Sequence, residues 1–315
     1  MDDGAGALIA AAAGDVAGGA DPVTYSAITQ TATVVAYHLL TNDAIARDEL
    51  ATELVELAGG GGGRFTYRMP SKALDEWLDS SRAGTPSASP WPSSEPAARA
   101  VPIGVFFRNR ADDLVRAAIT SSRVTHIDAA TAVVAAAVAG AVAGSCYAQS
   151  GADLVLGAAE TAERACRLIE EEAYRFGDVP DASAVVDRLR GAARSTGSEP
   201  QEIVEALVGS RRPEGVDGAI LGIVVGAASF SEPIRLIEAA ADSGGSEVGA
   251  VTGGIVGARS GLVQWPWRVQ NDTWFAELGR RLVAGRSEVR DLPIPYAVEE
   301  RMMMAPRAKP SEETI

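Results

Sequence analysis

Cysteine and histidine are scarce, with only two of each among 315 residues. A structural zinc site takes four such ligands at close spacing, but Cys146 and Cys166 have neither a second cysteine pair nor a histidine pattern near them. Both cysteines lie in Ala-rich segments, where we expect reduced, half-buried core thiols. The sequence therefore predicts no zinc site.

Basic residues are too few to balance the acids, with 28 Lys and Arg against 42 Asp and Glu and a net charge of −14. A surface of this sign repels phosphate backbones and anionic lipid headgroups. We therefore expect neither nucleic acid nor a membrane as a partner. The first residues, MDDGAG, carry acid where a secretory signal needs base, and we expect a cytoplasmic protein.

Long apolar runs are rare, and only residues 129–145 approach the length of a membrane span. This run is mostly Ala and Gly, which contribute little to transfer into lipid, and the acidic Asp128 stands at its start. We expect a tightly packed internal helix here.

Alternating strand patterns are also scarce, whereas apolar residues recur at the three- and four-residue spacing of helices. The sequence therefore predicts an all-α fold. Ser198, with Gln201 three residues later, has the spacing of a capping box. The helical spacing covers residues 44–57, 72–79, 112–120, 129–143, 152–176, 182–194, 200–208, 217–228, 233–242 and 248–262.

Several of these segments carry Ala and Gly where most globular helices carry Leu. Small side chains let helix axes approach closely, so we place these segments at the centre of the bundle. They are residues 7–20, 135–145, 219–230 and 249–261.

No sharp change of composition divides the chain, and we expect one domain over residues 1–298. From Glu299 on, few apolar residues could anchor the chain, and we expect a disordered tail over residues 299–315.

Four segments match, in order, the motifs of one known family. Residues 6–19 read GALIAAAAGDVAGG, and residues 25–30 read YSAITQ. Residues 94–104 read SEPAARAVPIG and are followed by SSRVTHIDAATAV, and residues 243–258 read SGGSEVGAVTGGIVGA. In order and spacing, this set resembles the motifs of the ADP-ribosylglycohydrolase family, all-α enzymes that remove ADP-ribose from proteins and small molecules. The resemblance implies a compact orthogonal helical bundle.

The resemblance also implies a pair of divalent cations, held by aspartates of the second and last motifs, that bind the ribose diol and help to place the attacking water. Here Ala27 and Ile28 replace the first two aspartates, and neither offers an oxygen ligand. In the last motif, the aspartate positions fall on Gly244 and Ser246, and the threonine becomes Glu247. We therefore expect no binuclear metal centre and no cofactor.

The register of the last motif stays open, because a shift of one to three residues would bring Asp242 or Glu247 into an aspartate position. No shift rescues the first motif, since no acid lies between Asp21 and Asp43. Ser94 and Glu95 also replace the family's nucleotide-binding asparagine and glycine, which puts ordinary ADP-ribose binding in doubt.

The candidate site residues follow from the matched motifs, and each has a structural alternative. A buried Asp15 could cap a turn, Ser26 and Thr29 could cap a helix, and the charge of Glu247 would be stabilised at a helix start without a ligand. A structural ion pair is the alternative for Arg99, and a satisfied core histidine for His126. The candidate catalytic acids are Asp15, Asp21 and Glu247; the candidate ligand-binding residues are Ser26, Thr29, Arg99, His126, Ser246 and Glu247.

Three functions are compatible with these residues. The first is a pseudoenzyme that binds an ADP-ribose-like or other nucleotide-like molecule, or a protein partner. The second is a metal-independent hydrolase or lyase acting on a glycosidic type of bond, which would need two acid–base groups at a suitable distance. The third is an oligomeric structural protein.

Overall fold

The computed structural model describes residues 2–19, 24–59, 67–171, 182–228, 232–285, 289 and 291–304, and within these residues it contains helices and no β-strand. The all-α prediction is therefore confirmed. The first half of the chain forms α1 Asp3–Gly18, α2 Ala27–Asn42, α3 Arg47–Gly59, α4 Lys72–Arg82, α5 Glu95–Ala98, α6 Val101–Phe106, α7 Ala111–Thr125 and α8 Ala129–Gly144.

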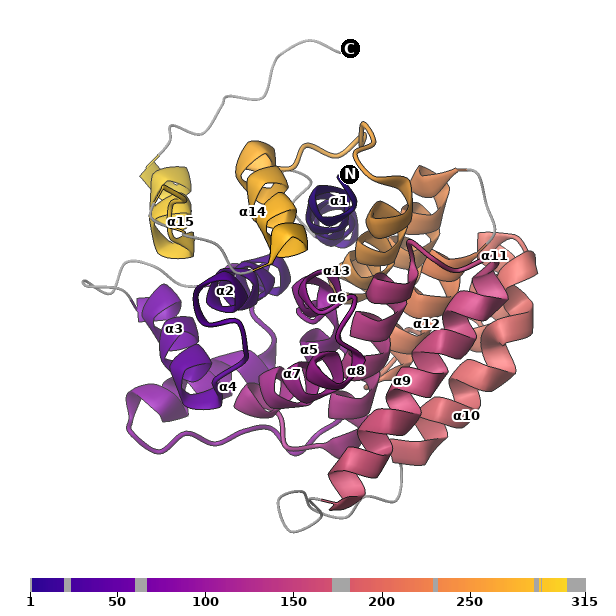
Figure 1. Cartoon of the computed structure of the whole chain (residues 1–315), viewed down its shortest axis with the longest axis horizontal. Helices are drawn as coiled ribbons and strands as arrows, with labels where there is room; N and C mark the ends of the chain where they lie inside the picture. Colours follow the sequence, from indigo (N-terminus) through magenta and orange to yellow (C-terminus); the bar gives the residue numbers. More distant parts are fainter. Residues whose placement is uncertain are drawn as a thin grey trace.

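The second half continues the bundle, with a short 3₁₀ helix η2 between α10 and α11. In Figure 1, α1 is seen nearly end-on while α9 and α10 lie close to the plane of the picture, so the helices cross at steep angles. The elements are α9 Gly151–Glu171, α10 Ala182–Ala192, η2 Ala193–Gly197, α11 Pro200–Leu207, α12 Asp217–Ala227, α13 Pro233–Ser260, α14 Asp272–Ala284 and α15 Pro295–Met304.

The Ala- and Gly-rich helices occupy the centre, as the sequence predicts. Helix α8 is buried over nearly its whole length and packs against α5, α6, α7 and α9. Asp128 caps its start, where the carboxylate accepts a hydrogen bond from the backbone N–H of Thr131 at 2.7 Å. No helix in the described part of the chain is long and apolar enough to cross a membrane.

Helices α1 and α13 make the closest contact in the bundle, because glycine stands at their interface on both sides. A Cβ atom on Gly14 would overlap the carbonyl oxygen of Gly249, and a Cβ atom on Gly249 would overlap that of Gly14. The helices run antiparallel with this contact repeated every four residues. The other facing pairs are Gly6 with Gly257, Ala10 with Gly253 and Gly18 with Gly245.

Helix α13 joins two segments that the sequence separates. The predicted helices at residues 233–242 and 248–262 lie in one element with a break at Gly245, whose φ is 74° and ψ is −159°. A residue with a side chain rarely adopts this φ, so the break requires glycine. The break starts a new helical segment at Ser246, next to the end of α1.

Three local predictions need correction. The capping box is formed by Glu199 and Glu202, one residue later than predicted. Cys166 is buried as expected, but Cys146 is exposed, and both thiols are free. The predicted disorder from Glu299 on is wrong for residues 299–304, because α15 extends to Met304; residues 305–315 lie outside the described residues.

The contact between α1 and α13 predicts that alanine substitutions at two glycines have opposite effects on the free energy of unfolding. Gly249→Ala places a methyl group against the backbone of α1 and should lower the free energy of unfolding by about 1–3 kcal/mol. Gly157→Ala, in α9, meets no atom within 4 Å and should raise it by about 0.5–1 kcal/mol through helix propensity. Urea denaturation of both variants measures the difference, and a G249A protein as stable as the wild type would contradict the close contact.

Candidate functional site

Asp15 is fully buried near the end of α1 and holds the first turn of α2. Its Oδ2 atom accepts hydrogen bonds from the backbone N–H of Ser26 at 2.8 Å, from the backbone N–H of Thr29 at 3.2 Å and from the hydroxyl of Thr29 at 2.7 Å. Burial raises the pKa of this carboxyl, and the hydrogen bonds from Thr29 and Ser26 oppose the rise. Asp15 therefore has the capping role that the sequence left as its structural alternative.

Ser26 and Thr29 complete the same helix start. The hydroxyl oxygen of Ser26 accepts a hydrogen bond from the backbone N–H of Ile28 at 3.1 Å, which makes Ser26 the N-cap of α2. Thr29 is buried, and its hydroxyl points to Asp15. Ser26 also lines a cleft, so a contact between its side chain and a ligand there stays a prediction.

The cleft has a volume of about 310 Å³ and lies where the matched motifs meet. It is enclosed by the end of α1, the break within α13, the starts of α2 and α5, and two loops. Its lining residues are Gly18, Gly19, Ser26, Ala27, Ile28, Met69, Ser71, Glu95, Arg212, Pro213, Gly244, Ser246 and Glu247. A larger and more open groove, of about 800 Å³, is lined mainly by residues 262–273, and Ile9 is the only matched motif residue among its described lining residues.

The last motif lines the cleft through Ser246 and Glu247. The hydroxyl of Ser246 donates a hydrogen bond to the backbone oxygen of Asp15 at 2.9 Å and so joins α13 to α1. Burial and the negative charge of Glu95 raise the pKa of Glu247 to about 7, and Arg212 partly opposes the rise. Near neutral pH the Glu247 carboxyl is therefore divided between its protonated and charged forms.

Glu95, Ser71 and Arg212 are cleft residues that were not candidates from the sequence. Glu95 is 2% exposed, and one of its oxygens accepts a hydrogen bond from the hydroxyl of Ser71. Its other oxygen, Oε1, has no hydrogen-bond partner among the described residues and lies 4.0 Å from the Nη1 atom of Arg99. Glu95 was named in the sequence analysis only because it replaces a nucleotide-binding residue of the family. No local sequence pattern indicates that Ser71 or Arg212 belongs to a site.

Arg99 and His126 lie behind the cleft wall and are absent from its lining. Arg99 is fully buried and donates hydrogen bonds to the backbone oxygen of Ser121 at 3.2 Å and to the hydroxyl of Thr125 at 2.5 Å. Burial and the charge of Arg99 lower the pKa of His126 to about 3, so the imidazole is neutral. Direct contact of either side chain with a ligand stays a prediction, and Arg99 reaches the cleft only through Glu95.

Asp21, the remaining catalytic candidate, lies outside the described residues. The structure therefore brings Asp15, Ser26, Thr29, Ser246 and Glu247 together around one cleft edge. It places Arg99 and His126 one layer further in.

The described residues do not fit a binuclear metal centre. Ala27 and Ile28 line the cleft and supply no oxygen ligand, and Asp15 is already bound to the start of α2. No group of three or more His, Cys, Asp or Glu side chains in the described part of the chain is placed to hold a metal ion. Two dications need several carboxylates to offset dehydration and mutual repulsion, and Glu95 and Glu247 are the only carboxylates among the described lining residues.

Comparisons with known proteins agree with the fold and with the family resemblance. A solved structure titled "ADP-ribosylglycohydrolase-related protein complex" matches with a TM-score of 0.62 and 17% sequence identity, over 90% of this chain and 97% of that chain. At this identity the likeness shows the fold. A search of curated proteins gives no match. The sequence model of the family described as ADP-ribosylglycohydrolase matches residues 2–291, and the chain therefore belongs to this family.

Proposed function

We propose that this protein has given up metal-dependent hydrolysis and uses the cleft to bind a nucleoside-like or ADP-ribose-like small molecule. The observation that carries the proposal is the combination of a polar cleft with apolar residues at the metal positions. Ser26, Ser246, Glu247 and Glu95 line the cleft, while Ala27 stands at one of the positions where the family places aspartate.

The charges of the lining residues determine where the phosphate end and the ribosyl end of such a molecule can lie in the cleft. Two carboxylates, Glu95 and Glu247, face one guanidinium, Arg212, so a phosphate group is favoured only near Arg212. The carboxyl groups that line the cleft accept hydrogen bonds, which a ribose hydroxyl or an amino group can donate. The cleft volume of about 310 Å³ is at the lower end for small-molecule sites and suits a ribosyl or nucleoside group.

A metal-independent hydrolase is the second candidate, and the pKa of Glu247 favours it. A carboxyl with a pKa of about 7 can act as a general acid at neutral pH, and Glu95 lines the same cleft as a possible partner base. A protein partner and an oligomeric structural role rest on the family resemblance alone.

Calorimetric titration with adenosine, ADP-ribose and NAD tests the binding proposal. We expect saturable binding of at least one of them to the wild type and a roughly tenfold loss of affinity in Glu247→Ala, because a buried hydrogen-bond partner is removed. Glu238→Ala, an exposed position on the same helix, is the matched control and should bind like the wild type.

Absence of binding by all three molecules would contradict the proposal. Turnover of an ADP-ribosylated substrate in the presence of EDTA, lost in Glu247→Ala, would favour the hydrolase instead. A concentration-independent monomer in light scattering would remove the oligomeric alternative.

Titration with Mg²⁺ and Mn²⁺ tests the loss of the metal centre. We expect no stoichiometric high-affinity binding, because the described cleft offers too few carboxylates for two dications. The measurement is calorimetry on protein dialysed against chelator, with EDTA itself as the positive control for the heat signal. Two tightly bound metal ions per chain would overturn the proposed loss.

The raised pKa of Glu247 predicts a pH-dependent gain in stability on Glu247→Gln. The folded state holds this proton more tightly than the unfolded state, so the wild type loses the associated stability as the pH rises from the ordinary value of 4.5 to about 7. The variant should equal the wild type near pH 4.5 and exceed it by about 2 kcal/mol at pH 8, allowing for solvent screening of the half-buried carboxyl.

Urea denaturation at both pH values measures the difference, and exposed Glu238→Gln serves as the control. A difference that does not change with pH would show that folding does not raise the pKa of Glu247.

A further inference from the structure

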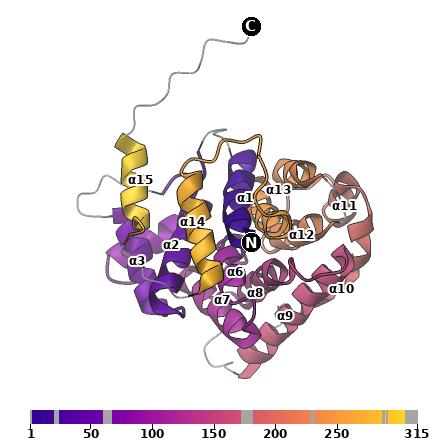
Figure 2. The same cartoon turned by 45° about the horizontal axis from the view of Figure 1, so that its top comes forward.

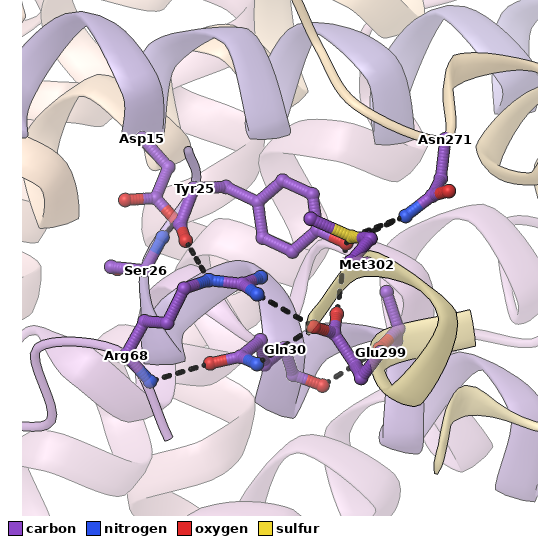
Figure 3. A network of polar contacts seen from close by, with 9 residues as sticks. Asp15, Tyr25, Ser26, Gln30, Arg68, Asn271, Glu299 and Met302 are labelled. Atoms are coloured by element: carbon purple, nitrogen blue, oxygen red, sulfur yellow. Dashed lines mark hydrogen bonds and ion pairs between the residues drawn. The ribbon is translucent and has the colours of Figure 1, made fainter. Parts of the chain in front are cut away.

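Glu299 is a buried carboxylate on the last helix, far along the chain from the cleft motifs. It is 2% exposed, and its two oxygens accept three hydrogen bonds (Figure 3). The donors are the hydroxyl of Tyr25 at 2.8 Å, the side-chain amide of Gln30 at 3.0 Å and the guanidinium of Arg68 at 2.8 Å. A buried carboxylate needs such partners to offset its lost hydration, so the set acts as one unit.

These three donors belong to the two segments that form one wall of the cleft. Tyr25 directly precedes Ser26, and Arg68 directly precedes Met69, and both Ser26 and Met69 line the cleft. Gln30 lies in the first turn of α2. Glu299 therefore binds the neighbours of lining residues and does not line the cleft itself.

The two wall segments are also bound to each other through Arg68. Its backbone N–H donates to the side-chain oxygen of Gln30 at 2.9 Å, and its side chain donates from Nε to the backbone oxygen of Tyr25 at 2.8 Å. Its backbone oxygen accepts from the N–H of Ala27 at 2.6 Å, and its guanidinium lies 4.5 Å from the centre of the Tyr25 ring. The guanidinium that fixes this arrangement is itself held by Glu299.

Besides Glu299, helix α15 buries Val298, and the sulfur of Met302 lies within hydrogen-bond distance of Tyr25 and Asn271. In both Figure 1 and Figure 2 α15 lies at the edge of the bundle, separated from α1 by α14. It contacts α2 and α3, and it spans only ten residues, a length at which an isolated helix is marginal in water. Its docking depends on the few side chains that it buries, among which Glu299 carries the only charge in the described part of the helix.

We propose that Glu299 is a positioning residue of the cleft, which couples the docking of the C-terminal helix α15 to the geometry of the wall that carries Ser26 and Met69. Through Tyr25, Gln30 and Arg68 it holds both wall segments in register. The coupling to ligand affinity rests on the proposed function of the cleft, whereas the coupling to wall geometry does not.

The test compares Glu299→Gln with Glu300→Gln, the exposed neighbour on the same helix. The first variant removes the charge that pairs with Arg68 and turns one of the two acceptor oxygens into a donor, while the second changes solvent-exposed charge only. Hydrogen exchange followed by mass spectrometry should show roughly tenfold faster exchange in peptides covering residues 24–30, 67–71 and 295–304 of E299Q. E300Q should match the wild type, and Glu299→Asp, which keeps the charge, should show a smaller change.

Faster exchange in residues 295–304 alone would overturn the proposal, because α15 would then be a surface helix with no effect on the wall. Unchanged exchange in all three segments would overturn it as well. If E299Q is too unstable to measure, the same comparison with E299D decides between these outcomes.

Titration with the ribosyl molecule that binds the wild type best gives the second measurement, with an expected loss of affinity of about tenfold in E299Q. Equal affinity despite a loosened wall would remove the coupling to the ligand. If the wild type binds neither adenosine, ADP-ribose nor NAD, the proposed function is contradicted. The hydrogen-exchange result for Glu299 remains valid in that case.

Discussion

The close approach of α1 and α13 is the contact on which the rest of the site depends. Backbone meets backbone at Gly14 and Gly249, since a methyl group on either would overlap the other helix. This contact brings the end of α1 against the break at Gly245, where the hydroxyl of Ser246 reaches the backbone oxygen of Asp15. Bulkier interface residues would move these helices apart and separate the first motif from the last.

Asp15 holds the start of α2, where Ala27 and Ile28 stand at the positions of the family's aspartates. The Oδ2 atom of its buried carboxylate accepts three hydrogen bonds from the start of α2, whereas Oδ1 has no hydrogen-bond partner among the described residues. Meanwhile Ala27 and Ile28 are only 2% and 8% exposed, so they add apolar contact where aspartates would add repulsion. The turn is thus held by capping and packing, and its shape does not depend on a bound ion.

Features that depend on local residue spacing can be predicted from the sequence, whereas features that depend on tertiary contacts cannot. The Ala- and Gly-rich composition of contiguous residues was sufficient to predict that α8 and α1 lie at the centre of the bundle. The sequence separates residues 233–242 from 248–262, but it does not indicate that they form one element with a break at Gly245, which lies against Gly18. Glu95 and Arg212 became site residues only when distant loops met. Glu299 was assigned to a disordered tail because the donors that bury it lie more than 200 residues earlier.

Two buried carboxylates from opposite ends of the chain support the turn at the start of α2. From α1, Asp15 binds the backbone of Ser26 and Thr29; from α15, Glu299 binds the side chains of Tyr25 and Gln30. Each support is a buried carboxylate facing several donors, an arrangement strongly destabilised when one partner is removed. Because neither carboxylate belongs to the aspartate positions of the family's metal motifs, replacement of those aspartates leaves both supports intact. The proposed loss of the metal centre and the presence of a formed cleft are for this reason physically compatible in one chain.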